Sequence, residues 1–91
     1  MTSGNATVED WQRDAARLPI QWTGELDDDC TAMWAGLMLR AEAMADSEWW
    51  WAVYDAKTNV IIGDSNTPLA FVATGVEARA AAERVAKKWL A

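Results

Sequence analysis

The chain contains no histidine and a single cysteine among its 91 residues. Histidine is the commonest general base at neutral pH and a common metal ligand, so its absence excludes Ser–His and Cys–His nucleophilic arrangements and the usual zinc ligand sets. One cysteine cannot form an internal disulfide. Since residues 1–6 also lack the basic and apolar regions of a signal peptide, the sequence predicts a cytoplasmic location.

Long apolar runs are also missing, and none approaches the roughly 20 residues that a membrane-spanning helix needs. Positive charge is scarce, because 8 basic residues face 14 acidic ones and leave a net charge of −6. A negatively charged chain is repelled by phosphate backbones, so we expect neither membrane insertion nor direct nucleic-acid binding. The acids gather early in the chain, within residues 1–29.

Tyrosine and phenylalanine are scarce, with one of each, but the chain has seven tryptophans. The run 49–51 is three tryptophans and leads into Ala-Val-Tyr-Asp. Aromatic and β-branched residues favour strands, and the same character returns at 60–62 after a polar connector at 55–59. These features predict a β-hairpin formed by residues 48–55 and 59–63.

The hairpin places apolar side chains on both of its faces. Because successive strand residues point to opposite sides, Trp49, Trp51 and Val53 share one face. Trp50 and Tyr54 share the other. Such a hairpin needs cover on both sides, from helices or from another chain.

Two helices are predicted at the ends of the chain. A short one spans residues 8–17, because apolar residues recur there at helical spacing and Pro19 follows. A long one spans residues 75–90, since Thr74 and Glu77 form a capping box. Its stripe of mostly small residues indicates close packing on the sheet.

A third, central helix is predicted over residues 29–45. The apolar residues there keep i, i+3, i+4, i+7 spacing, and the acidic run 27–29 suits a helix amino terminus. This set comprises Cys30, Met33, Trp34, Leu37, Met38, Ala41 and Met44. Gly36 would lie near the middle of the helix, at a cost of roughly 1 kcal/mol relative to alanine.

The expected fold class is therefore α+β. A small antiparallel sheet, made of the hairpin 48–55/59–63 with a third strand at 69–73, packs against the two long helices 29–45 and 75–90 and the short helix 8–17. A weak edge strand at 20–23 adds to the sheet. Residues 7–91 form one domain, and residues 1–6 are expected to be disordered.

Candidate chemistry is sparse, and no catalytic residue, metal site or cofactor is predicted. Cys30 belongs to the apolar stripe, which favours a buried structural thiol over a reactive one. The acids Glu25 and 27–29 lack the glycine and the distant glutamate of a calcium loop. The stretch 63–66 has neither the P-loop lysine nor a nucleophile-elbow pattern, so we read it as a connector.

The second hairpin face supplies the main candidate for a binding surface. It must meet the N-terminal segment, a partner protein or a second copy of the chain in a homodimer. Tryptophan and tyrosine are enriched at interaction hot spots. The predicted partner-binding residues are Trp11, Trp22, Glu25, Asp27, Asp28, Asp29, Trp50 and Tyr54.

The favoured function is a small, acidic, tryptophan-rich and non-enzymatic protein that docks on a nucleic-acid-handling protein. It could be an inhibitor, or an antitoxin-like, immunity-like or phage-type counter-defence factor, because its charges would suit a basic groove. One alternative is a sensor of a small molecule or peptide, with a tryptophan-lined pocket between hairpin and helices. Weaker alternatives are a single-strand binding platform and an enzyme using Asp55, Asp64 or Ser65.

Overall fold

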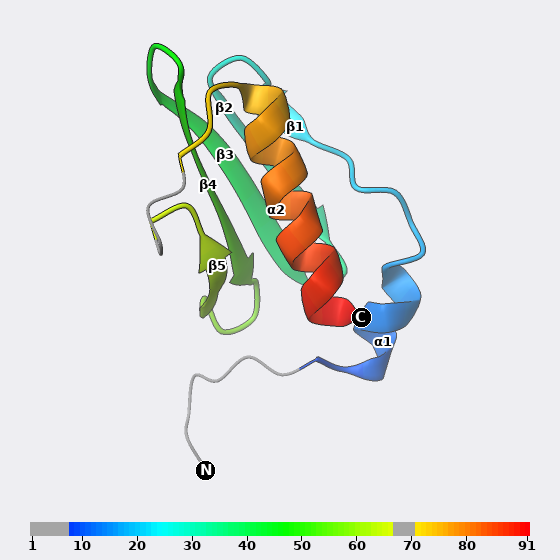
Figure 1. Ribbon diagram of the computed structural model, residues 1–91. Coiled ribbons are helices and arrows are strands. Elements are labelled where there is room, and N and C mark those ends of the chain that lie inside the picture. The colour runs from blue at the N-terminus through cyan, green and yellow to red at the C-terminus, as the bar shows by residue number, and fades with distance from the viewer. Residues whose placement is uncertain (1–7, 67–70) are drawn as a thin grey trace.

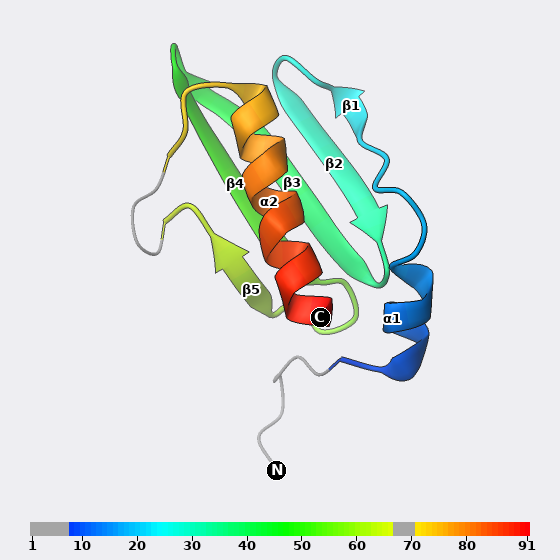
Figure 2. The same cartoon turned by 45° about the vertical axis from the view of Figure 1, so that its right-hand side comes forward.

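The computed structural model describes residues 8–66 and 71–91, which form an antiparallel sheet with one long helix on one face (Figures 1 and 2). Five strands lie side by side in chain order, from β1 to β5. The elements are α1 (Asp10–Ala15), β1 (Thr23–Glu25), β2 (Asp29–Trp34), β3 (Leu37–Ala45), β4 (Glu48–Asp55), β5 (Ile61–Asp64) and α2 (Gly75–Leu90). The expected fold is therefore wrong: the described part is a five-stranded antiparallel sheet with one short helix and one C-terminal helix, not a small sheet packed against two long helices.

The predicted helix over 29–45 is wrong, because these residues form strands β2 and β3. A two-residue turn joins the strands at Ala35 and Gly36, whose φ angles are 51° and 77°. Positive φ at both central residues gives a turn whose twist matches that of paired strands. Gly36 also lies against Trp11, because a Cβ placed there would come within 2.6 Å of its ring. The glycine therefore marks a hairpin turn.

Two apolar patterns overlap in this segment, which explains the error. On the side facing α2, the buried residues follow a strand period of two and include Leu39, which is fully buried and absent from the predicted helical stripe. On the other side, Met33 and Met44 are 63% and 58% exposed. These methionines, on the side of the sheet away from α2, combine with buried residues of the other side to give the helical spacing that led to the wrong prediction.

The predicted β4–β5 hairpin is present, with its second strand at Ile61–Asp64 instead of 59–63. The Asp55 carboxylate closes the loop by accepting hydrogen bonds from the backbone N–H groups of Lys57 and Thr58, at 2.8 and 3.1 Å. Asn59 adopts a φ of 62°, the left-handed conformation that asparagine tolerates. Polar residues in the connector thus specify the turn as expected.

Other predicted boundaries shift or fall outside the described residues. The helix expected over 8–17 is shorter, at Asp10–Ala15, and the edge strand expected at 20–23 begins at Thr23. Residues 1–6 and 69–70 lie outside the described ranges. The strand predicted at 69–73 is not found in its described part, residues 71–73, where Val72 makes only an isolated bridge with Trp49.

Helix α2 begins and ends as the capping pattern predicts. The Thr74 hydroxyl accepts a hydrogen bond from the backbone N–H of Glu77 at 3.1 Å. The side of α2 that meets the sheet carries Leu90 and four alanines, whose small side chains let the helix lie close to β3 and β4: Ala78, Ala81, Ala82 and Ala86. Neither helix of the described ranges is long and apolar enough to cross a membrane.

Candidate functional site: the open face of the sheet

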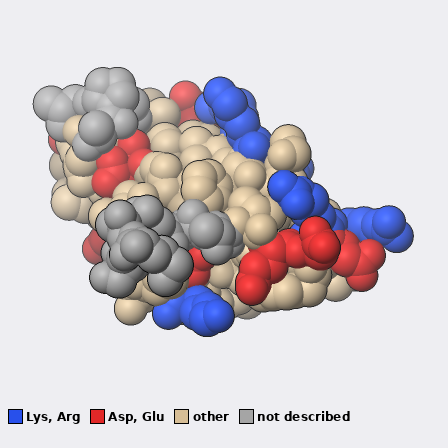
Figure 3. Space-filling view, turned by 90° about the horizontal axis from the view of Figure 1, so that it is seen from below, with Lys and Arg blue, Asp and Glu red and all other residues tan. Residues whose placement is uncertain are grey.

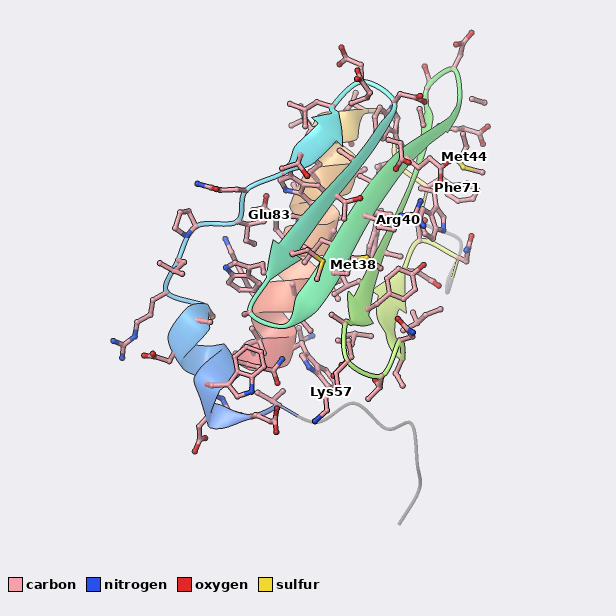
Figure 4. The ribbon with its side chains drawn as sticks, turned by 180° about the vertical axis from the view of Figure 1, so that it is seen from behind. Met38, Arg40, Met44, Lys57, Phe71 and Glu83 are labelled. Carbon is pink, nitrogen blue, oxygen red and sulfur yellow. The ribbon has the colours of Figure 1, made fainter. Side chains whose placement is uncertain are left out.

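The sheet has one covered face and one face that no other described element covers. Alternate residues of β2, β3 and β4 point toward α2 and form the core. The residues between them point away from α2, toward the viewer in Figure 4. We call this second side the open face. Exposed apolar side chains on this face include Met33, Met44 and Ile61.

Apolar side chains on the open face are concentrated along β4. Cross-strand pairing aligns Met38 with Tyr54 and Tyr54 with Ile61 at one end. The other end carries Met44 and Phe71, which are labelled in Figure 4. We call this set the β4 strip, and it comprises Met38, Met44, Trp50, Ala52, Tyr54, Ile61 and Phe71.

The members of the β4 strip differ in their exposure. Met44, Ile61 and Phe71 are exposed, at 58%, 53% and 42%, whereas Trp50 and Tyr54 are only partly exposed. Ala52 in the middle is fully buried, although it lies on this face. The strip therefore has a well-packed centre and adaptable ends, because methionine side chains are flexible and fit irregular partners.

Arg40 borders the strip and organises its charged side. One of its guanidinium nitrogens, Nη2, lies 3.8 Å from a carboxylate oxygen of Asp29 and 3.8 Å from one of Glu42. The guanidinium carbon also lies 5.7 Å from the centre of a Trp50 ring. The two partly exposed ion pairs orient Arg40, and the cation–π contact joins it to the indole of Trp50; each of these interactions is individually weak.

The charges of the molecule differ between the two sides. On the open face, the paired rows carry five carboxylates, from Glu25, Asp29, Glu42, Glu48 and Asp64, against the one cation of Arg40, a net of −4. Helix α2, on the other side, carries four basic and two acidic residues, a net of +2. The open face is thus locally acidic around an apolar centre.

The predicted binding residues do not form one surface. Trp50 and Tyr54 do lie together on the open face, as the alternation of β4 predicts. Trp22 instead donates its indole N–H to Glu83 of α2 at 2.9 Å. Trp11 lies on α1 and donates to Glu9 at 2.8 Å. The two N-terminal tryptophans are therefore separate from the strip.

The acidic residues also take different places. Glu25 pairs in register with Asp29, and Asp27 and Asp28 lie exposed in the turn between β1 and β2. Their predicted role at a helix amino terminus is wrong, because a strand follows them. Asp29 and its register partner Glu25 lie on the open face, and Asp29 contacts Arg40 there. In the described ranges, no group of three or more acidic or cysteine side chains is placed to hold a metal ion.

Most of the tryptophans lie away from the open face, and of the seven only Trp50 belongs to the β4 strip. Trp34, Trp49 and Trp51 belong to the core, and only Trp11 is strongly exposed, at 55%. The exposed apolar residues that the sequence reading missed are the methionines, with Ile61 and Phe71. Alternation along β3 could have placed Met38 on the face opposite Leu37 and Leu39, but it could not have placed Met44, because the register shifts between Ala43 and Ala45.

A cleft of about 370 Å³ lies at the lower end of the molecule, between α1 and the β4–β5 loop. It is lined by Glu9, Trp11, Gln12, Gly36, Asp55, Ala56, Lys57 and Thr58. Figure 3 views this end, where uncharged side chains occupy the middle and charged ones the margin. Most polar groups of the lining are already used: the buried Gln12 donates to the carbonyl of Ala35 at 2.9 Å. The cleft is therefore a weaker candidate than the open face.

Residues considered for catalysis serve the fold. Ser65 is fully buried, and its hydroxyl accepts the backbone N–H of Trp51 at 3.1 Å. Asp55 is buried and closes its loop, and Asp64 accepts the backbone N–H of Asn66 at 3.0 Å. Cys30 is 1% exposed, which agrees with the predicted structural thiol. These groups do not converge on a common point in a cleft.

Comparison with known proteins adds no relative: no protein-family model, curated protein or solved structure matches this chain. The expected roles of inhibitor and phage-type factor thus find no support. The geometry of the open face is the remaining guide to function.

Proposed function

We propose that this chain is a small, non-enzymatic protein-binding domain that docks on another protein through its open face. The observation that carries the proposal is the β4 strip, an apolar row that includes a tryptophan and a tyrosine and has charged residues at its border. Interfaces have this arrangement, with a buried apolar centre inside a polar rim, and their hot spots are enriched in tryptophan and tyrosine.

The acidic border indicates what kind of partner fits. A net charge of −6 steers the chain toward basic surfaces and increases the association rate with them. Proteins that handle nucleic acids present such surfaces, because they must bind phosphate. We therefore propose a nucleic-acid-handling protein as the partner. We place the interaction in the cytoplasm, since the one cysteine is a buried free thiol.

Removing two exposed anchors of the strip should abolish most of the binding. The double variant Met44→Ser/Ile61→Ser deletes two side chains that are 58% and 53% exposed, so folding loses little. Each anchor buries apolar area on docking, and a combined loss near 1.4 kcal/mol lowers affinity about tenfold. Affinity capture from cell lysate, quantified by mass spectrometry, measures the loss.

The matched control is Val76→Ser, which removes an apolar side chain that is 68% exposed on α2, away from the open face. A specific partner is one retained by the wild-type chain and by this control, and depleted by the double variant. If all three chains retain every protein equally, the open face is not the docking surface.

A further inference from the structure

We infer that the β4 strip receives a basic amphipathic α-helix of the partner protein, lying along β4 on the side of the sheet opposite α2. This inference rests on the proposed function and specifies the shape and charge of the partner. It follows from the length of the strip, its width and the charges on both of its borders.

The length of the strip suits a short helix. Trp50 and Tyr54 lie four residues apart on β4, which corresponds to about 13 Å along a strand. A helix rises about 1.5 Å per residue, so about nine residues span this distance. Anchor side chains at i, i+3 or i+4, and i+7 would therefore contact both Trp50 and Tyr54.

The width of the β4 strip favours a helix over a sheet as the part of the partner that docks on it. A helix is about 10 Å across, which covers about two strands spaced 4.8 Å apart. A sheet laid flat on the open face would also bury Arg40 with Asp29 and Glu42, whose side chains are 34%, 50% and 40% exposed. Burying partly hydrated charges is unfavourable. A helix centred on β4 leaves these carboxylates at its border and in water.

Charged groups border the strip on both sides. Glu42 and Asp29 lie toward β2, and Asp64 lies on β5, in register with Ala52. Lysine and arginine side chains extend from a helix along apolar surface and keep their charged ends in water. A helix with basic residues on both flanks of its apolar face would thus meet a carboxylate on either side.

A second copy of the chain fits less well. Two open faces brought together would each contribute the net charge of −4 derived above, so they would repel each other. The outward side of α2 is basic but offers little apolar area, since its exposed apolar side chains are Val76 and the small Ala80. It cannot fill the strip of a neighbouring molecule. The occupant is therefore a helix of a different protein.

The test is an NMR titration of the full chain with an amphipathic peptide of about 18 leucines and lysines, long enough to form a helix. A peptide of equal composition but scrambled order is the control. We expect the amphipathic peptide to bind at least about tenfold more tightly, with the largest amide shifts at Trp50, Ala52 and Tyr54. Met44→Ser/Ile61→Ser should weaken binding, and so should Glu42→Gln/Asp64→Asn; Val76→Ser should not.

Equal binding of both peptides, or shifts centred on α2 or on the cleft near Trp11, would overturn the inference. Sedimentation that shows a dimer through the strip, broken by Met44→Ser/Ile61→Ser, would identify a second copy as the occupant and also overturn it. If lysate capture depends on the strip while the peptide fails, only the helical partner is wrong. If capture does not depend on the strip, the proposed function fails as well.

Discussion

Leu39→Ala is expected to lower the free energy of unfolding by about 2–5 kcal/mol, the usual range for a buried leucine. Leu39 is fully buried in β3 and points toward α2. Alanine would leave a cavity between the sheet and the helix, because the neighbouring side chains relax only partly. Urea denaturation followed by tryptophan fluorescence measures the change in midpoint.

The neighbouring residue provides the matched control. Met38 lies on the open face and is half-buried, so Met38→Ala should cost less than about 1 kcal/mol. A central helix over 29–45 predicts the reverse order, because Met38 belongs to its apolar stripe and Leu39 does not. A larger loss for Met38→Ala would thus contradict the strand assignment.

Ala82→Leu is expected to destabilise the fold by about 1–3 kcal/mol, through overpacking. Ala82 is fully buried on the side of α2 that faces the sheet. The small residues on this side allow close approach, and a leucine would force the helix outward or into strained rotamers. Thermal unfolding followed by circular dichroism reports the loss as a lower Tm.

The control for this substitution is Ala80→Leu on the exposed side of the same helix. It makes the same chemical change without entering the core, so its effect should stay within about 0.5 kcal/mol. If the two variants have the same Tm, α2 does not pack on the sheet through its small residues.

Local signals in the sequence predicted helix α2 and the β4–β5 hairpin well. Thr74 and Glu77 specify the start of α2, and the polar residues 55–59 specify the turn of the β4–β5 hairpin. In each case a side chain bonds the backbone a few residues away, so the signal depends on neighbours alone. Trp50 and Tyr54 were placed together on one face for a similar reason, since alternation is local.

Tertiary contacts decided the centre of the chain, where the prediction failed. Residues 29–45 carry apolar side chains at both helical and strand periods, and short apolar runs do not distinguish the two. Pairing of β3 with β2 and β4 satisfies the strand period. Ala35 and Gly36 could have shown the turn, but an alanine with positive φ is unusual and carries no clear turn signal.

The central claim is that the sheet keeps its second face open for a partner, and the exposure of its methionine methyl groups tests this most directly. NMR of the chain labelled at methionine, leucine and valine methyls, with a soluble gadolinium chelate, measures that exposure. The chelate should enhance the relaxation of the Met33 and Met44 methyl protons as strongly as that of the Val76 methyls, whereas the Leu39 methyls should be protected from it. Protection of Met33 and Met44 to the level of Leu39 would show a covered face and contradict the account.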